Sequence, residues 1–222
     1  MTETPTPKAA AAPFLPDVLP IFPLIGTVLL PRGRLPLNVF EQRYLTMIND
    51  ALGRGRMIGV IQPSDPDTQN PAPTLYQVGC AGRITSFAET DDGRYLITLS
   101  GLCRFSVAAE LPQERIYRCV KPDWSAYQAD VGPEEDAPFD RVRLTEVLRY
   151  YFKTQGIAAD WSAVQNASGE TLITSLTMMC PLEPNEKQAL VEAPGLLERA
   201  ELLTALLEMA CVAPPDADIA RH

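Results

Sequence analysis

The chain has 222 residues, of which 46% are hydrophobic and 21% charged, the usual balance of a globular protein that can bury a sizeable core. Charges or prolines interrupt every apolar stretch, which excludes a membrane-spanning helix, and the N-terminus lacks the features of a secretory signal. The net charge of −9 resides in the second half, with 16 acidic and 7 basic residues from Ser125 to His222. We therefore expect a cytoplasmic location, no membrane partner and little affinity for nucleic acid.

The first elements are predicted from prolines and from helical spacing. Residues 1–16 are rich in proline and alanine and predict a disordered tail. The apolar stretch from Leu19 to Pro31 is interrupted by prolines, which do not fit a central strand. It therefore predicts two short edge segments joined by a bend near Gly26.

A single helix is expected next, because apolar residues recur at helical spacing from Phe40 to Leu52. Asn38 is the expected N-cap, with Glu41 as the acceptor at the third position. Gly53 fits the C-terminal stop of this helix.

Alternation of apolar and polar residues predicts a set of short strands after the helix. We expect strands at Met57 to Ile61 and at Leu75 to Phe87, and a hairpin that turns at Asp91 to Gly93. A further strand should follow a break at Gly101, and a last one should run from Ile116 to Val120. Six or so short strands with one helix predict a small, closed or nearly closed barrel over residues 17–127.

The second half is predicted to be helical. Residues 128–138 are acidic and contain proline, which suits a linker, and four amphipathic helices are expected over residues 139–212, before a tail at 213–222. Pro181 should end the second of these helices, and Pro184 should lie in the first turn of the third. The fold class is therefore α+β, a small barrel followed by a helical bundle. The apolar stripes of the first, second and fourth helices are Leu144, Val147, Leu148 and Tyr151; Leu172, Ser175, Leu176 and Met179; and Leu196, Ala200, Leu203, Leu207 and Ala210.

The sequence offers little catalytic chemistry. Its only histidine is His222, which disfavours a Ser-His-Asp or Cys-His site, and its five cysteines are too scattered for a zinc site. A phosphate cradle is not expected at Gly53–Arg56, because this turn lies between a helix and a strand, in the wrong order. We therefore expect no enzyme activity, no metal and no cofactor.

The order of these segments resembles the N-terminal, substrate-recognising domain of the Lon protease family. The resemblance starts with the proline-bounded stretch from Leu19 into Phe40-Glu41-Gln42-Arg43-Tyr44 and continues at Ile58 to Gln62 and Asp92 to Phe105. It implies a PUA-like barrel followed by a helical subdomain, in a stand-alone member without ATPase or peptidase. It also implies recognition of unfolded or specific client polypeptides, as an adaptor or chaperone-like binder, with a separate ATP-dependent protease as a further partner.

Five residues are candidates for contacting a polypeptide: Arg32, Arg34, Glu41, Arg43 and Tyr44. Arg32 and Arg34 lie in a glycine-containing loop beside apolar residues, and the other three belong to the sequence that carries the resemblance. A structural reading stays open for Phe40 and Tyr44 as core residues, for Glu41 as part of the helix cap and for Arg43 as the partner of a carboxylate. RNA binding and a small-molecule regulator remain the alternative functions.

Overall fold

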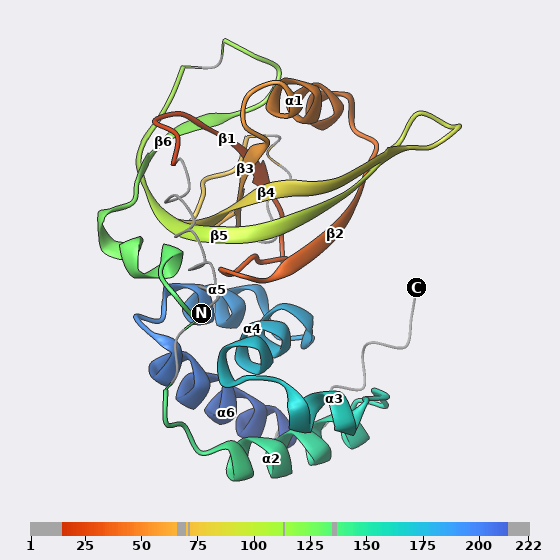
Figure 1. Ribbon diagram of the computed structural model, residues 1–222, viewed down its shortest axis with the longest axis vertical. Coiled ribbons are helices and arrows are strands. Elements are labelled where there is room, and N and C mark those ends of the chain that lie inside the picture. Colours follow the sequence, from red (N-terminus) through yellow and green to blue (C-terminus); the bar gives the residue numbers. More distant parts are fainter. Residues whose placement is uncertain (1–14, 66–69, 71, 113, 135–136, 213–222) are drawn as a thin grey trace, which may run out of the picture.

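The computed structural model describes residues 15–65, 70, 72–112, 114–134 and 137–212, so residues 1–14 of the tail predicted at 1–16, and the whole tail predicted at 213–222, lie outside the described residues (Figure 1). The chain combines a six-stranded sheet with helices, which confirms the α+β class. The elements are β1 (Leu19–Pro23), β2 (Arg34–Val39), α1 (Gln42–Leu52), β3 (Met57–Ile61), β4 (Val78–Glu89), β5 (Tyr95–Glu110), β6 (Cys119–Asp123), the 3-10 helix η1 (Ser125–Val131), α2 (Arg141–Thr154), α3 (Trp161–Asn166), α4 (Gly169–Met179), α5 (Pro184–Glu192) and α6 (Leu196–Val212).

The sheet has the order β2-β5-β4-β3-β1-β6, and β5 pairs with β6 as well. The strand pairing therefore closes into a ring, and β2 extends the sheet outside it. The ring runs through the pairs β5–β4, β4–β3, β3–β1, β1–β6 and β6–β5. Only β1 and β3 are parallel among these neighbours. The 16 residues of β5 make this possible, because its first half pairs with β2 and β4 and its last residues pair with β6.

The first stretch differs from the prediction. The strand β1 lies between β3 and β6 rather than at an edge, and residues 24–33 form no second strand. Its prolines are tolerated because the β1–β6 ladder has only two residue pairs and Pro23 is the last residue of β1. The bend at Gly26 is confirmed by its left-handed φ of 66°. The edge strand is β2, which the sequence did not predict.

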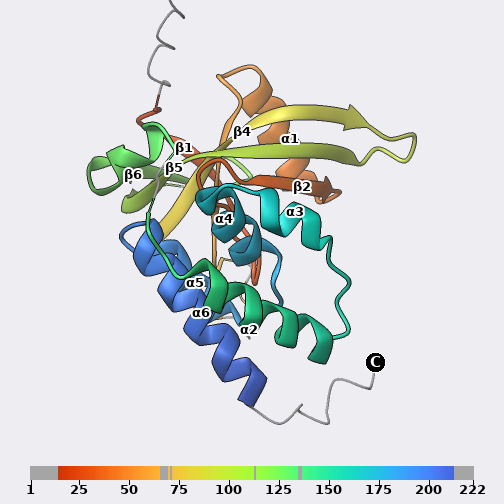
Figure 2. The same cartoon turned by 60° about the horizontal axis from the view of Figure 1, so that its bottom comes forward.

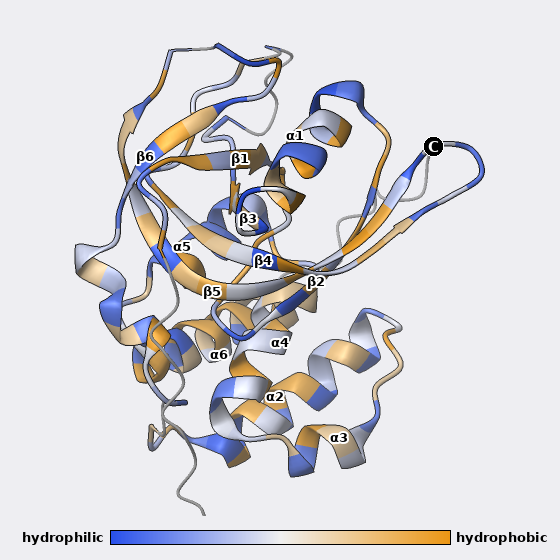
Figure 3. Cartoon of the chain, turned by 45° about the horizontal axis from the view of Figure 1, so that its top comes forward, coloured by the Kyte–Doolittle hydropathy of each residue, from blue (hydrophilic) through white to orange (hydrophobic). Residues whose placement is uncertain are grey.

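The helix α1 ends at Gly53 as predicted but begins later than expected. Asn38 is not the N-cap, because it pairs with Leu96 in the sheet, and Glu41 holds the cap position without a side-chain cap bond. Phe40 precedes the helix and is 66% exposed, so its predicted place in the core is wrong. Figure 3 shows the polar side of α1 turned outward and its apolar side facing the sheet.

Helices occur at all four predicted places, and the short α3 is an addition. They begin where side chains or proline favour a start: the carboxylates of Asp140 and Asp160 and the hydroxyl of Ser168 accept from backbone N–H groups, and Pro184 is the first residue of α5. The helices α2 to α6 gather at the end of the molecule opposite α1 (Figures 1 and 2).

The α4 stripe is the main error in the helical half. Ser175 and Met179 are exposed, whereas Ile173 and Thr177 are buried with Leu172. The helix buries two sides because it packs on the other helices and also, through Met178, on residues next to the sheet. A helix buried on two sides does not carry a single apolar stripe.

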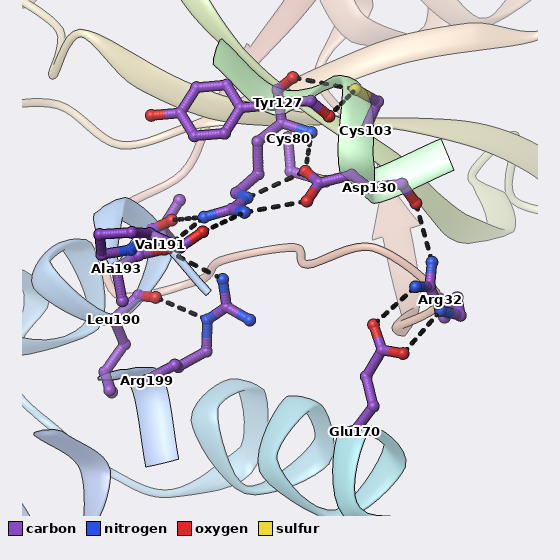
Figure 4. A network of polar contacts seen from close by, with 12 residues as sticks. Arg32, Cys80, Cys103, Tyr127, Asp130, Glu170, Leu190, Val191, Ala193 and Arg199 are labelled. Carbon is purple, nitrogen blue, oxygen red and sulfur yellow. Dashed lines mark hydrogen bonds and ion pairs between the residues drawn. The ribbon is translucent and has the colours of Figure 1, made fainter. Parts of the chain in front are cut away.

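A polar network joins the sheet to the helices (Figure 4). Arg104 of β5 forms a bidentate ion pair with Asp130 of η1 at 2.9 Å, and both side chains are less than a tenth exposed. The same guanidinium donates to the carbonyl oxygens of Val191 and Pro194, at 3.1 and 3.3 Å. Residues 128–131 of the predicted linker belong to η1, and Asp130 among them holds the guanidinium of Arg104, which bonds to the helical half.

Candidate functional site

Two neighbouring cavities lie where α1 meets the segment 111–118. Their volumes are about 390 and 270 Å³, and Tyr117 lines both, so the two cavities are neighbours; we call the pair the α1 groove. The larger cavity is lined by Pro16, Val18, Pro20, Asp50, Ala51, Arg54, Met57, Leu111, Pro112, Glu114, Arg115, Tyr117 and Cys119. The smaller is lined by Pro23, Leu24, Ile25, Arg43, Tyr44, Pro63, Asn70, Ala72, Pro73, Ile116, Tyr117 and Arg118.

Exposed aliphatic side chains line both cavities of the α1 groove. Val18 is 51% exposed in the larger cavity, and Ile25 and Ile116 are 49% and 53% exposed in the smaller. Apolar side chains that reach solvent beside a depression can be covered by the apolar side chains of a partner. The groove therefore offers contact to aliphatic or aromatic groups.

The charges of Asp50 and Arg115, which line the larger cavity, neutralise each other. The Tyr117 hydroxyl donates to Oδ2 of Asp50 at 2.5 Å and accepts from Arg115 Nη1 at 2.8 Å, and Arg115 also pairs with Asp50. The hydrogen bond from Tyr117 holds the pKa of Asp50 below its usual value. Burial, followed by the Asp50 carboxylate, raises the pKa of Tyr117 to about 12. The phenol thus stays protonated at neutral pH and anchors residues 115–117 to α1.

Two of the five residues predicted from sequence lie in the smaller cavity, and a third lies beside them. The guanidinium of Arg43 stacks over the ring of Tyr44 at 4.6 Å, and the Tyr44 ring packs on Phe22 with ring centroids 4.1 Å apart. Glu41 forms an ion pair with Arg43 at 2.8 Å. The structure therefore brings Glu41, Arg43 and Tyr44 together, and Arg43 has the carboxylate partner that the structural reading expected.

Arg32 and Arg34 lie elsewhere, at a third cavity of about 220 Å³ between β2 and α4. Arg32 pairs with Glu170 of α4 at 2.9 Å and donates to the carbonyl oxygens of Asp130 and Pro133 (Figure 4). Its side chain thus helps to join the sheet to the helices. Arg34, at the start of β2, is exposed.

Sequence reasoning missed Asp50, Arg115 and Tyr117. Asp50 is 65 residues from Arg115, and nothing in the local pattern of either segment marks the contact. The signal was limited to an arginine and a tyrosine two residues apart, where the last predicted strand begins. Their pairing with α1 depends on how the ring of strands closes.

The titratable groups of the groove are suited to binding rather than to nucleophilic attack. Cys119 lines the larger cavity, and burial raises the pKa of its thiol, so the thiol is protonated at neutral pH. Within the described residues no three His, Cys, Asp or Glu side chains gather in a way that would hold a metal ion. None of the helices in that part of the chain is both long and apolar enough to cross a membrane.

Comparison with known proteins shows the family to which the chain belongs. The family model of the ATP-dependent protease La (LON) substrate-binding domain matches residues 18–209. Lon protease 2 of Myxococcus xanthus is 36% identical over 220 residues, which cover 90% of this chain and 25% of that protein. The Lon protease of Flavobacterium johnsoniae is 27% identical over 190 residues, 84% of this chain and 23% of that protein. The chain thus spans about a quarter of the length of these relatives.

Two solved structures share the fold. The Lon N-terminal domain protein from Xanthomonas campestris superposes with a TM-score of 0.60 at 24% identity, covering 85% of this chain and 97% of that one. The N-terminal domain of the Mycobacterium avium complex Lon protease gives a TM-score of 0.61 at 14% identity, covering 86% and 98%. The chain therefore belongs to the family of LON substrate-binding domains.

Proposed function

We propose that this chain is a non-catalytic polypeptide-recognition module that binds exposed apolar segments of client polypeptides in the α1 groove. The observation that carries the proposal is the pair of neighbouring cavities that share Tyr117, with exposed aliphatic side chains lining both. Membership of a substrate-binding family supports the same class of ligand.

The dimensions of the groove suit a short stretch of unfolded chain. Cavities of about 390 and 270 Å³ are large enough for a few side chains rather than for a folded surface. Folded proteins bury most of their large apolar side chains, whereas an unfolded chain exposes them. The groove should therefore prefer unfolded polypeptides, and because Asp50 is paired with Arg115 and Arg43 with Glu41, this apolar contact should depend little on salt.

The finer architecture belongs to the same proposal. The ring of strand pairs supports a PUA-like barrel over residues 17–127, and the helices from 139 to 212 form the second subdomain. The guanidinium of Arg104, which Asp130 holds, joins the two through its hydrogen bonds to the carbonyl oxygens of Val191 and Pro194. We place the chain in the cytoplasm, without a cofactor, as an adaptor or chaperone-like binder that hands clients to an ATP-dependent protease.

Two alternatives have less support. Seven of the 14 arginines in the described residues form ion pairs with carboxylates, so half of them are already neutralised and are not free to contact an RNA backbone. A small-molecule site would favour an enclosed cavity with a carboxyl group of raised pKa. Asp50, a carboxyl group of the larger cavity, instead has a lowered pKa and a side chain that is 35% exposed.

The proposal is tested by placing charge in the groove. The double variant Ile25→Asp/Ile116→Asp should bind a labelled unfolded polypeptide at least ~10-fold more weakly, because two aspartates oppose the burial of apolar side chains. Val142→Asp is the matched control: Val142 is 71% exposed on α2, in the helical half of the molecule. Fluorescence anisotropy measures both affinities. Equal losses in the groove variant and the control would contradict the assignment of the groove.

A further inference from the structure

Four arginines differ from all others in the described part of the chain. No hydrogen bond, ion pair or ring contact involves the side chains of Arg34, Arg54, Arg56 and Arg83, and all four are exposed. The remaining described arginines pair with carboxylates, donate to backbone carbonyl oxygens or stack on an aromatic ring; they are Arg32, Arg43, Arg94, Arg104, Arg115, Arg118, Arg141, Arg143, Arg149 and Arg199.

The four arginines follow one another across the molecule. Arg34 of β2 is opposite Ser100 of β5, and Ser100 is opposite Arg83 of β4. Directly opposed residues project from the same face of a sheet, so Arg34 and Arg83 flank Ser100, on the order of 10 Å apart across two strand spacings. Arg83 in turn is opposite Met57, which directly follows Arg56.

Arg54 and Arg56 extend this row into the turn between α1 and β3. The backbone oxygen of Arg56 accepts from the N–H of Ile84, which ties the turn to β4 beside Arg83. Cations at these two positions are also favoured by the C-terminus of α1. That effect does not reach Arg34 and Arg83, which lie on strands. We call the four residues the arginine band.

Both ends of the arginine band open into cavities. Arg54 lines the larger cavity of the α1 groove, and Arg34 lines the cavity between β2 and α4, beside Met178 and Met179. Met179 is 80% exposed, and methionine adapts to apolar partners of varied shape. The band is therefore continuous with the surface that the proposed function assigns to apolar segments.

We propose that the arginine band binds acidic stretches of a client polypeptide, so that the protein selects apolar segments followed or preceded by aspartate and glutamate. Guanidinium groups without a carboxylate partner in a chain of net charge −9 are complementary to such stretches. This inference rests on the proposed function, since it names the class of client that the same site prefers.

The residues beside the arginine band favour an acidic polypeptide over a nucleic acid as its ligand. Single-stranded RNA is bound by stacking its bases on aromatic rings beside a basic surface. The residues that share the sheet row with the band are Ser100 and Met57, neither of them aromatic. Binding of RNA through the band is thus an outcome that the test has to distinguish.

The test uses three labelled unfolded peptides that share one apolar segment and carry flanks of four glutamates, four glutamines or four lysines. The protein variant is Arg34→Gln/Arg56→Gln/Arg83→Gln, which leaves Arg54 in the groove unchanged. The control Lys121→Gln/Arg149→Gln/Lys153→Gln removes the same charge from exposed positions elsewhere. Anisotropy at low and high salt gives the affinities, and a single-stranded RNA is titrated as competitor.

We expect the wild-type and control proteins to bind the glutamate-flanked peptide about tenfold more tightly than the glutamine-flanked one at low salt, since three exposed ion pairs add up to about that factor. Salt and the triple variant should abolish this preference and leave binding of the glutamine-flanked peptide unchanged. Equal binding of the glutamate- and lysine-flanked peptides would overturn the arginine band while preserving the groove. Binding of RNA, but not of glutamate flanks, through the three arginines would overturn it in favour of a nucleic acid. Failure of all three peptides to bind would overturn the proposed function as well.

Discussion

At the scale of single residues, Arg104 makes several hydrogen bonds and an ion pair that a substitution would remove. It is a charged side chain at the junction of sheet and helices, and its charge is offset by a bidentate carboxylate and by backbone carbonyl oxygens of the α5–α6 connection. Burial of a guanidinium is tolerated only with such partners. The surface pair Arg94–Asp92 has a similar separation of 2.9 Å, but half of each side chain or more is exposed.

The change Arg104→Met should therefore lower the free energy of unfolding by about 3–5 kcal/mol, because it leaves Asp130 buried without its cation. Arg94→Met, the matched control, should cost less than ~1 kcal/mol. Urea unfolding followed by circular dichroism measures both. Similar small losses in the two variants would mean that the junction does not depend on this ion pair.

Single residues also show how far the sequence predicts the site. Arg43 and Tyr44 were predicted because they lie in a recognisable run of sequence, and both line the groove. Asp50 was missed because its partners Arg115 and Tyr117 are distant in sequence. Local patterns show which residue types are present, but contacts between distant segments depend on the strand pairing.

At the scale of elements, β5 shows that a glycine in the sequence can mark either the end of a strand or a place where another backbone approaches closely. Gly101 predicted a break, yet β5 continues through it, and its N–H and carbonyl bond to the backbone of Gly33 and Arg32. A Cβ at this position would collide with the carbonyl oxygen of Leu30. Gly101 is therefore required because another backbone approaches it closely, not because the strand ends.

Gly101→Ala should consequently destabilise the fold by about 3 kcal/mol, since the collision is with backbone atoms that cannot rotate away. Gly53→Ala is the control, because its φ of −81° suits alanine and the nearest atom, the oxygen of Asp50, would be 3.7 Å from the new Cβ. It should change stability by less than ~1 kcal/mol. Thermal unfolding compares them, and equal midpoints would refute the close-approach explanation.

Elements with a strong local signal were predicted correctly, and those decided by tertiary packing were not. The apolar run of β3 and the proline at the start of α5 occur where the sequence placed them. The edge strand β2 was missed because Pro36 and two exposed polar residues weaken its pattern. The start of α1 was placed too early because Asn38 belongs to β2, whose pairing with β5 extends that strand to Val39.

At the scale of the whole molecule, the sheet lies between the candidate site and the helical half. The α1 groove lies on the side of the sheet that carries α1, whereas α2 to α6 gather on the other side (Figure 1). The network around Arg104 fixes the two halves to each other. Under the proposed function, a polypeptide in the groove would lie away from the helices, and the proposed arginine band would cross the sheet between the groove and the β2–α4 cavity.

The proposed function requires the protein to distinguish unfolded from folded polypeptide. The most direct measurement is fluorescence anisotropy of a labelled, permanently unfolded polypeptide of balanced charge, with its folded parent as the comparison. We predict that the unfolded form binds at least ~10-fold more tightly than the folded parent, because only the unfolded form exposes the apolar side chains that fill the groove. Equal affinity for the two forms, or no binding of either, would contradict the account.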